Sequence, residues 1–121
     1  MSIQVQHSEM VAGLTKPGAD ILETLTPAKV NLLHHSYAAI IEVAELNDAI
    51  KKFIIYNKEL DYENMVEELG DIEFYLEGIR QAIGVTREAT LKANLDKLAV
   101  RYHQGTYSDQ QAQDRADKAG E

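Results

Sequence analysis

The sequence predicts an all-α protein: a helical bundle built on an antiparallel helix hairpin plus a third helix, completed by oligomerisation. Three observations predict this class. Apolar residues recur every three or four positions over long stretches, a Ser, Thr or Asp precedes each stretch, and no segment alternates polar and apolar residues convincingly. A chain of 121 residues with 45% hydrophobic content suits one domain with a modest core.

Capping residues mark the ends of the predicted helices. Ser, Thr and Asp accept hydrogen bonds from the first free amides of a helix, proline suits its first position, and glycine suits its end. These signals predict three long helices, from Thr26 to about Tyr56, from Asp61 to Ile83 before Gly84, and from Thr86 to about Tyr102. Weaker signals predict a short helix from Ser8 to Leu14, a loop around Lys16, Pro17 and Gly18, and a polar tail helix opened by Ser108 and Gln111.

This order of elements divides the chain into three parts. We expect residues 1–25 to form an N-terminal extension, residues 26–104 the main helical domain, and residues 105–121 a tail with a short helix. The absence of cysteine excludes disulfides and thiolate metal sites, and a net charge of -8 opposes binding to a nucleic-acid polymer. No apolar stretch has the length of a membrane span, so no membrane partner and a cytoplasmic location are expected.

Two acidic pairs with the same spacing are the strongest functional signal. Glu42 and Glu45 lie in one long apolar stretch, and Glu68 and Asp71 lie in the next. Residues three apart share one face of a helix, so each pair presents two carboxylates in one direction. Uncompensated carboxylates among apolar residues are costly, and oxygen-only clusters suit magnesium or manganese.

Counting from the turn near Asn57 brings the two pairs together. Glu45 comes twelve residues before that position and Glu68 eleven after it, so antiparallel packing sets them level, and Glu42 then faces Asp71. Two interpretations are open: a metal site made by four carboxylates, or solvated acids on helix faces. Gly70 either allows close approach of a helix or ligand, or is a tolerated surface glycine.

The two motifs carry a family resemblance. Glu42-Val-Ala-Glu45 and Glu68-Leu-Gly-Asp71, with the surrounding words EVAELNDAIKK, ENMVEELGDIEFYL and NLDKLAVRY, resemble the MazG-like all-α nucleoside triphosphate pyrophosphohydrolases. The resemblance is to the small single-domain forms of bacteria and phages, and it implies the host cytoplasm for a phage-encoded chain. It also implies hydrolysis of a (deoxy)nucleoside triphosphate to monophosphate and pyrophosphate, with magnesium held by the four acids. Homodimers or homotetramers would complete the site.

Candidate substrate contacts come from the third helix and from the first. Asn94, Lys97 and Arg101 follow one another at steps of three and four, so they share a face that suits polyphosphate and base edges. The resemblance favours Asn94 and Lys97 as substrate contacts. The alternative is that this face of the helix is exposed to solvent and binds nothing. His35 lies two turns before Glu42 and either contacts the substrate or packs in the core.

The predicted mechanism uses a polarised water for in-line attack on the substrate. Glu45 is the first candidate for a general base, unless it serves as a metal ligand. A di-iron protein is disfavoured because neither Glu42 nor Glu68 has a histidine three residues on. The alternative function is a non-catalytic acidic helical interaction module. Base and sugar preference cannot be predicted from the sequence.

Overall fold

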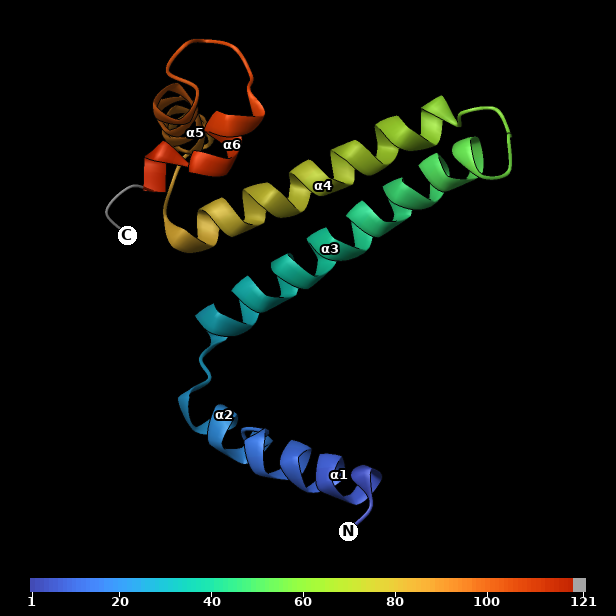
Figure 1. Cartoon of the computed structure of the whole chain (residues 1–121), viewed down its shortest axis with the longest axis vertical. Helices are drawn as coiled ribbons and strands as arrows, with labels where there is room; N and C mark the ends of the chain where they lie inside the picture. The colour runs from blue at the N-terminus through green and yellow to red at the C-terminus, as the bar shows by residue number, and fades with distance from the viewer. Residues whose placement is uncertain (119–121) are drawn as a thin grey trace.

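The computed structural model describes residues 1–118, which form helices joined by short connections (Figure 1). The helices are α1 (Ile3–Leu14), α2 (Gly18–Thr24), α3 (Pro27–Ile54), α4 (Tyr62–Ile83), α5 (Arg87–Arg101) and α6 (Asp109–Asp114), followed by a 3-10 turn, η1 (Ala116–Lys118). No strand occurs within the described residues, which confirms the predicted all-α class.

Helices α3 and α4 form the predicted antiparallel hairpin and lie side by side (Figure 1). The Oγ1 of Thr26 accepts a hydrogen bond from the backbone N–H of Lys29 at 3.2 Å and caps α3. The chain reverses through Asn57, whose φ of 52° is left-handed and suits asparagine. Asp61 then accepts a hydrogen bond from the N–H of Asn64 at 3.1 Å and caps α4. The predicted starts of both helices are confirmed.

The junction between α4 and α5 also follows the predicted signals. Gly84 has a φ of 74°, and its N–H donates to the carbonyl of Gln81 at 3.3 Å, so the left-handed cap that glycine favours ends α4. Thr86 accepts a hydrogen bond from the N–H of Ala89 at 3.0 Å and opens α5. Within one chain, α5 packs on α6 and η1, near the end of α4 that is farther from the hairpin turn (Figure 1). The described residues of one chain therefore do not show the predicted bundle.

The C-terminal tail folds back onto α5. The Oγ of Ser108 accepts a hydrogen bond from the N–H of Gln111 at 3.1 Å, so the predicted cap of the tail helix is confirmed. The Nε2 of Gln111 donates to the Oε1 of Gln104 at 3.2 Å, and the Nε of Arg101 donates to Asp117 at 2.7 Å. These two side-chain contacts attach the tail to the end of α5.

Helix α1 is longer than the sequence indicates. It begins at Ile3 rather than near Ser8, because Ser2 supplies an earlier cap whose Oγ accepts a hydrogen bond from the N–H of Val5 at 3.2 Å. The sequence analysis placed the start at Ser8 because that serine also precedes an apolar stretch. Its end at Leu14 agrees with the prediction.

The sequence analysis missed α2, which starts at the end of the predicted loop. The carbonyl of Pro17 accepts hydrogen bonds from the amides of Asp20 at 3.0 Å and Ile21 at 3.2 Å, and these bonds make the first turn. Asp20 in that turn also interacts favourably with the helix dipole. Seven residues are too few to establish an amphipathic repeat, so the Pro17-Gly18 pair dominated the prediction.

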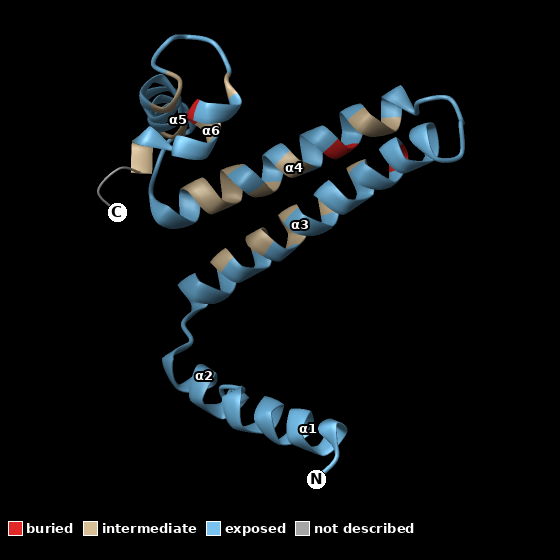
Figure 2. Ribbon diagram, in the orientation of Figure 1, coloured by how far each residue is buried: buried red, intermediate tan, exposed pale blue. Residues whose placement is uncertain are grey.

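Most of the described chain is exposed (Figure 2), and the exposed residues include many large apolar side chains. Ala49 is the one buried apolar residue among those described, and every residue of α1 and α2 is exposed. The accessible surface is 9858 Å². A compact protein of 13.5 kDa would expose about 6,500 Å². None of the helices within residues 1–118 has the length and apolar character needed to span a membrane.

Candidate metal centre

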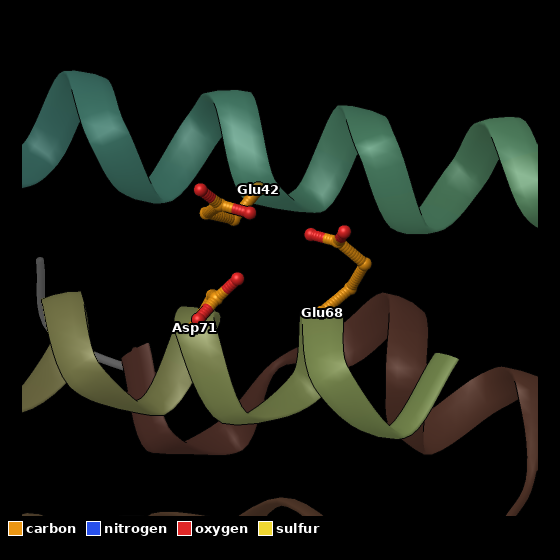
Figure 3. Close-up of side chains that lie close together, drawn as sticks. All are labelled: Glu42, Glu68 and Asp71. Atoms are coloured by element: carbon orange, nitrogen blue, oxygen red, sulfur yellow. The ribbon is translucent and has the colours of Figure 1, made fainter. Parts of the chain in front are cut away.

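Three of the four predicted acids meet across the hairpin. Glu42 comes from α3, and Glu68 and Asp71 come from successive turns of α4 (Figure 3). One carboxylate oxygen from each lies within 4.8 Å of the others. Residues 68 and 71 share a face because they are three apart, and the antiparallel register brings that face to Glu42. The three side chains converge on the space between the two helices (Figure 3).

Glu45 lies outside this group of three, but its carboxylate acts on Glu68. The pKa of Glu68 is raised from its ordinary value of 4.5 to about 7. The nearby carboxylate of Glu42 is the largest cause, because it can accept the proton of a neutral Glu68, and burial of the carboxyl and the negative charges of Glu45 and Glu42 follow. Without a cation, the cluster therefore retains a proton near neutral pH that an isolated glutamate would have lost.

Two oxygens of the cluster are buried without a hydrogen-bond partner among the described residues. They are the Oε2 atoms of Glu42 and Glu68. No ion pair in the described part of the chain involves Glu42, Glu45, Glu68 or Asp71. Buried carboxylate oxygens are costly unless they are paired or coordinate a metal. A divalent cation would satisfy both oxygens and offset the repulsion.

A hollow on the same hairpin gives access to the cluster. Its volume is about 470 Å³, and its lining is Ile41, Ala44, Glu45, Asp48, Asn64 and Glu68. Because Glu68 belongs to both the hollow and the cluster, a ligand in the hollow reaches the acids directly. Apolar groups, three carboxylates and the Asn64 amide line this space, and no basic residue is among the described lining residues, so an anionic ligand would need cations to bind there.

The predicted contacts on α5 lie away from this cluster within one chain. Asn94 and Lys97 are exposed on α5, which lies near the end of α4 that is farther from the hairpin turn (Figure 1). Arg101 is bound by Asp117 through two hydrogen bonds of 2.7 Å and 3.2 Å. Sequence reasoning did not anticipate this partner, because Asp117 lies in a tail that showed only a short polar helix.

His35 lies in the α3–α4 seam, two turns from the acids. A Cβ placed on Gly78 would come within 2.5 Å of the His35 Nδ1, so the ring depends on that glycine. Tyr75 lies beside it, with ring centroids 6.0 Å apart. Gly70, in contrast, has open space around it, and a Cβ there would meet nothing within 4 Å. The close approach that the sequence analysis considered at Gly70 is found at Gly78.

Gly78 is the residue that sequence reasoning missed, and the register could have found it. Gly78 lies as many residues after the centre of the hairpin turn as His35 lies before it, and the same is true of the facing pair Asp71 and Glu42. The count from the turn therefore sets the glycine opposite the histidine. It was overlooked because only acidic residues were counted across the hairpin.

Comparisons with protein-family models, with curated proteins and with solved structures find no match for this chain. Its function is therefore argued from the geometry of the acids and from the surfaces around them.

Proposed function

We propose that this chain is a metal-dependent nucleotide pyrophosphohydrolase, of the MazG-like type that its motifs resemble. It would convert a nucleoside or deoxynucleoside triphosphate to the monophosphate and pyrophosphate. One observation carries the proposal: carboxylate oxygens of Glu42, Glu68 and Asp71 lie within 4.8 Å of one another. Helices that bring three acids together without a basic partner favour a cation at that point, and a cation allows the site to accept an anionic substrate.

The donor set suits magnesium, with manganese as the alternative. The ligands are all carboxylate oxygens, and the two buried oxygens of Glu42 and Glu68 lack partners among the described residues. Hard divalent cations prefer such ligands, whereas zinc and copper favour nitrogen and sulfur. When bound, magnesium would lower the pKa of a coordinated water and neutralise charge on the phosphate oxygens.

The acids then divide into two roles. Glu42, Glu68 and Asp71 hold the cation, and Glu45 is the candidate general base, since it interacts with Glu68 and also lines the hollow. Glu45 would take a proton from the attacking water. The water oxygen forms a bond to the α-phosphorus as the bond to the α–β bridging oxygen breaks, and pyrophosphate leaves. Glu45 also remains a candidate ligand.

No basic residue is among the described residues that line the hollow beside the acids, so the polyphosphate needs positive groups from elsewhere. Asn94 and Lys97 are proposed to contact the polyphosphate and the base from the α5 of a second chain. Both side chains are exposed in the single chain, so they are accessible to the substrate of a second chain. Arg101 is proposed as a weaker contact, because it would have to leave Asp117.

A homodimer, or a homotetramer of dimers, is proposed to complete the bundle. The chain exposes 9858 Å², about 3,300 Å² more than expected for its mass, and obligate homodimers bury 1,000 Å² or more per chain. Leu69, Leu76 and Ile83 are 51%, 36% and 57% exposed and are spaced seven residues apart along α4. That spacing is typical of helices that pack against another helix pair.

Pyrophosphate release tests the proposed activity. A panel of ribo- and deoxyribonucleoside triphosphates is incubated with magnesium or manganese, and pyrophosphate is detected with and without a coupled pyrophosphatase. We expect metal-dependent pyrophosphate, with orthophosphate appearing only with the coupling enzyme. Glu68→Gln should lower turnover by about 100-fold or more, because it removes a metal ligand. The matched control is Glu67→Gln, the exposed neighbour on the same helix.

Three results would contradict the proposal or its site. Orthophosphate released without the coupling enzyme would mean cleavage at a different phosphate. No turnover of any nucleotide with either metal would favour the alternative, a non-catalytic acidic interaction module. Equal losses in the Glu67 and Glu68 variants would indicate a general charge effect rather than a site.

A further inference from the structure

We propose that the nucleobase of the substrate binds in a second pocket of the hairpin, two helical turns from the acids. The pocket has a volume of about 280 Å³ and is lined by His35, Phe74, Glu77, Gly78 and Gln81. The inference rests on the proposed hydrolase function and adds to it the residues that would bind the nucleobase. None of these five residues belongs to the acidic cluster.

The position of the pocket fits a nucleotide whose phosphates lie at the acids. His35 precedes Glu42 by seven residues on α3, and Gly78 follows Asp71 by seven on α4. Seven residues make two turns, or about 10.5 Å along a helix. The sugar and base of a nucleotide span a distance of this order. Both pairs also lie on the stripes that the two helices turn toward each other.

His35 offers one hydrogen-bond donor to the pocket. Its Nδ1 is buried without a partner among the described residues, and it faces the backbone of Gly78. A neutral imidazole carries its proton on one nitrogen only. A proton on Nδ1 would be a buried donor without an acceptor, so the favoured tautomer carries the proton on Nε2. The imidazole thus presents Nε2–H to an acceptor on a base.

The rest of the lining supplies what a base needs for stacking and for a second hydrogen bond. Phe74 is 66% exposed, so a face of its ring is open to stack on a base. The Glu77 carboxylate accepts hydrogen bonds, and the Gln81 amide both donates and accepts them. A planar ring with donors and acceptors on its edge is the ligand class that this combination fits.

A pair of glycine substitutions tests the pocket. Gly78→Ala places a Cβ 2.5 Å from the His35 Nδ1 and 2.6 Å from Cε1, which forces the ring out of position. Gly70→Ala on the same helix meets nothing within 4 Å and serves as the matched control. His35→Ala is the second variant, because it removes the ring without introducing a clash.

The measurements separate base binding from phosphate binding. For each triphosphate we expect Gly78→Ala and His35→Ala to raise KM about tenfold, as loss of one hydrogen bond does, with kcat nearly unchanged. Differences in kcat/KM between bases should shrink in both variants. Binding of inorganic tripolyphosphate with magnesium, measured by calorimetry, should stay at the wild-type value because this probe has no base. Gly70→Ala should match the wild type throughout.

The outcomes distinguish this inference from the proposed function. A wild-type chain that hydrolyses nucleotides, with KM and base preference retained in His35→Ala, overturns the pocket alone. Equal weakening of tripolyphosphate and nucleotide binding in both variants also overturns it, since the defect would then lie at the acids. A wild-type chain that hydrolyses no nucleotide overturns the proposed function and the base pocket together.

Discussion

Arg101 and Asp117 form a two-point ion pair between the end of α5 and η1. The Nε of Arg101 donates to Oδ1 of Asp117 at 2.7 Å, and Nη2 donates to Oδ2 at 3.2 Å. The two side chains are only 18% and 5% exposed. The guanidinium holds the pKa of Asp117 below its ordinary value. The arginine that the sequence analysis assigned to the substrate thus attaches the tail to α5.

We predict that Asp117→Asn releases the tail from α5. The substitution removes the charge that Arg101 binds and leaves a poorly exposed guanidinium unpaired, so the melting temperature should fall by several degrees. Hydrogen exchange should speed up in α6 and η1. Asp114→Asn is the control, because Asp114 is exposed and accepts a hydrogen bond of 2.6 Å from Gln110 on the same helix. A tail that stays protected in Asp117→Asn would contradict the anchoring role.

A second prediction concerns pH and Glu68. Its pKa rises from 4.5 in the unfolded chain to about 7 in the folded one, so the folded chain binds more protons between these values. Stability without metal should therefore fall as the pH rises from 4.5 to 7, and the loss is complete above 7. Melting temperatures at pH 5 and pH 8 test this. Glu68→Gln should remove most of the difference, whereas Glu67→Gln should retain it.

The fold was predictable where single residues fix the backbone. Thr26, Asp61 and Thr86 each accept a hydrogen bond from an amide three residues on, and Gly84 adopts the left-handed cap. Such signals are local, so the ends of the long helices could be predicted from the sequence. The docking of the tail could not, because Asp117 is sixteen residues from Arg101 and many other acids offered the same charge.

The candidate site was predictable to the extent that counting across one turn allows. The count set Glu42 opposite Asp71 and Glu45 level with Glu68, and the structure brings Glu42, Glu68 and Asp71 within 4.8 Å. Which acid becomes buried depends on side-chain rotamers, and the sequence does not fix these. The positions of α5 and its Lys97 relative to the acids depend on packing between elements, which no local pattern encodes.

The third prediction concerns metal binding. Manganese or magnesium should raise the melting temperature at pH 8. A ligand that binds only the folded chain raises the free energy of unfolding by about 2.7 kcal/mol when its free concentration is 100 times its Kd. Asp71→Asn should abolish most of this stabilisation while leaving the helical circular dichroism unchanged. Asp114→Asn, far from the cluster in sequence, is the control. A metal-induced shift that persists in Asp71→Asn would mean that the cation binds elsewhere.

The fourth prediction concerns the apolar face of α4. Leu76 stands between Leu69 and Ile83 at steps of seven residues, so a charge there should disrupt packing against a second chain. We expect light scattering to show a dimer or tetramer for the wild type and a monomer for Leu76→Asp. Leu76→Met, which conserves volume and apolar character, should keep the wild-type mass. A wild-type chain that is a stable and active monomer would refute the shared core.

The last prediction tests whether two chains share one site. Lys97→Gln and Glu68→Gln should each be inactive alone, the first because it lacks a phosphate contact and the second because it lacks a metal ligand. If α5 serves the acids of its partner, a mixed dimer contains one site with both wild-type groups. Random exchange makes half of the dimers mixed, and each has one intact site of two, so about a quarter of the wild-type activity should return.

A mixture of Glu68→Gln with Asp71→Asn provides the control for this experiment. Both acids lie on α4 of the same chain, so in a mixed dimer each hairpin still lacks one acid and activity should not return. Native mass spectrometry of chains with different isotope labels verifies that subunits have exchanged. Exchange without recovery for the Lys97 and Glu68 pair would mean that Lys97 acts on the acids of its own chain. In that case α5 would have to swing back along the hairpin when substrate binds, because within one chain it packs on α6 and η1 instead.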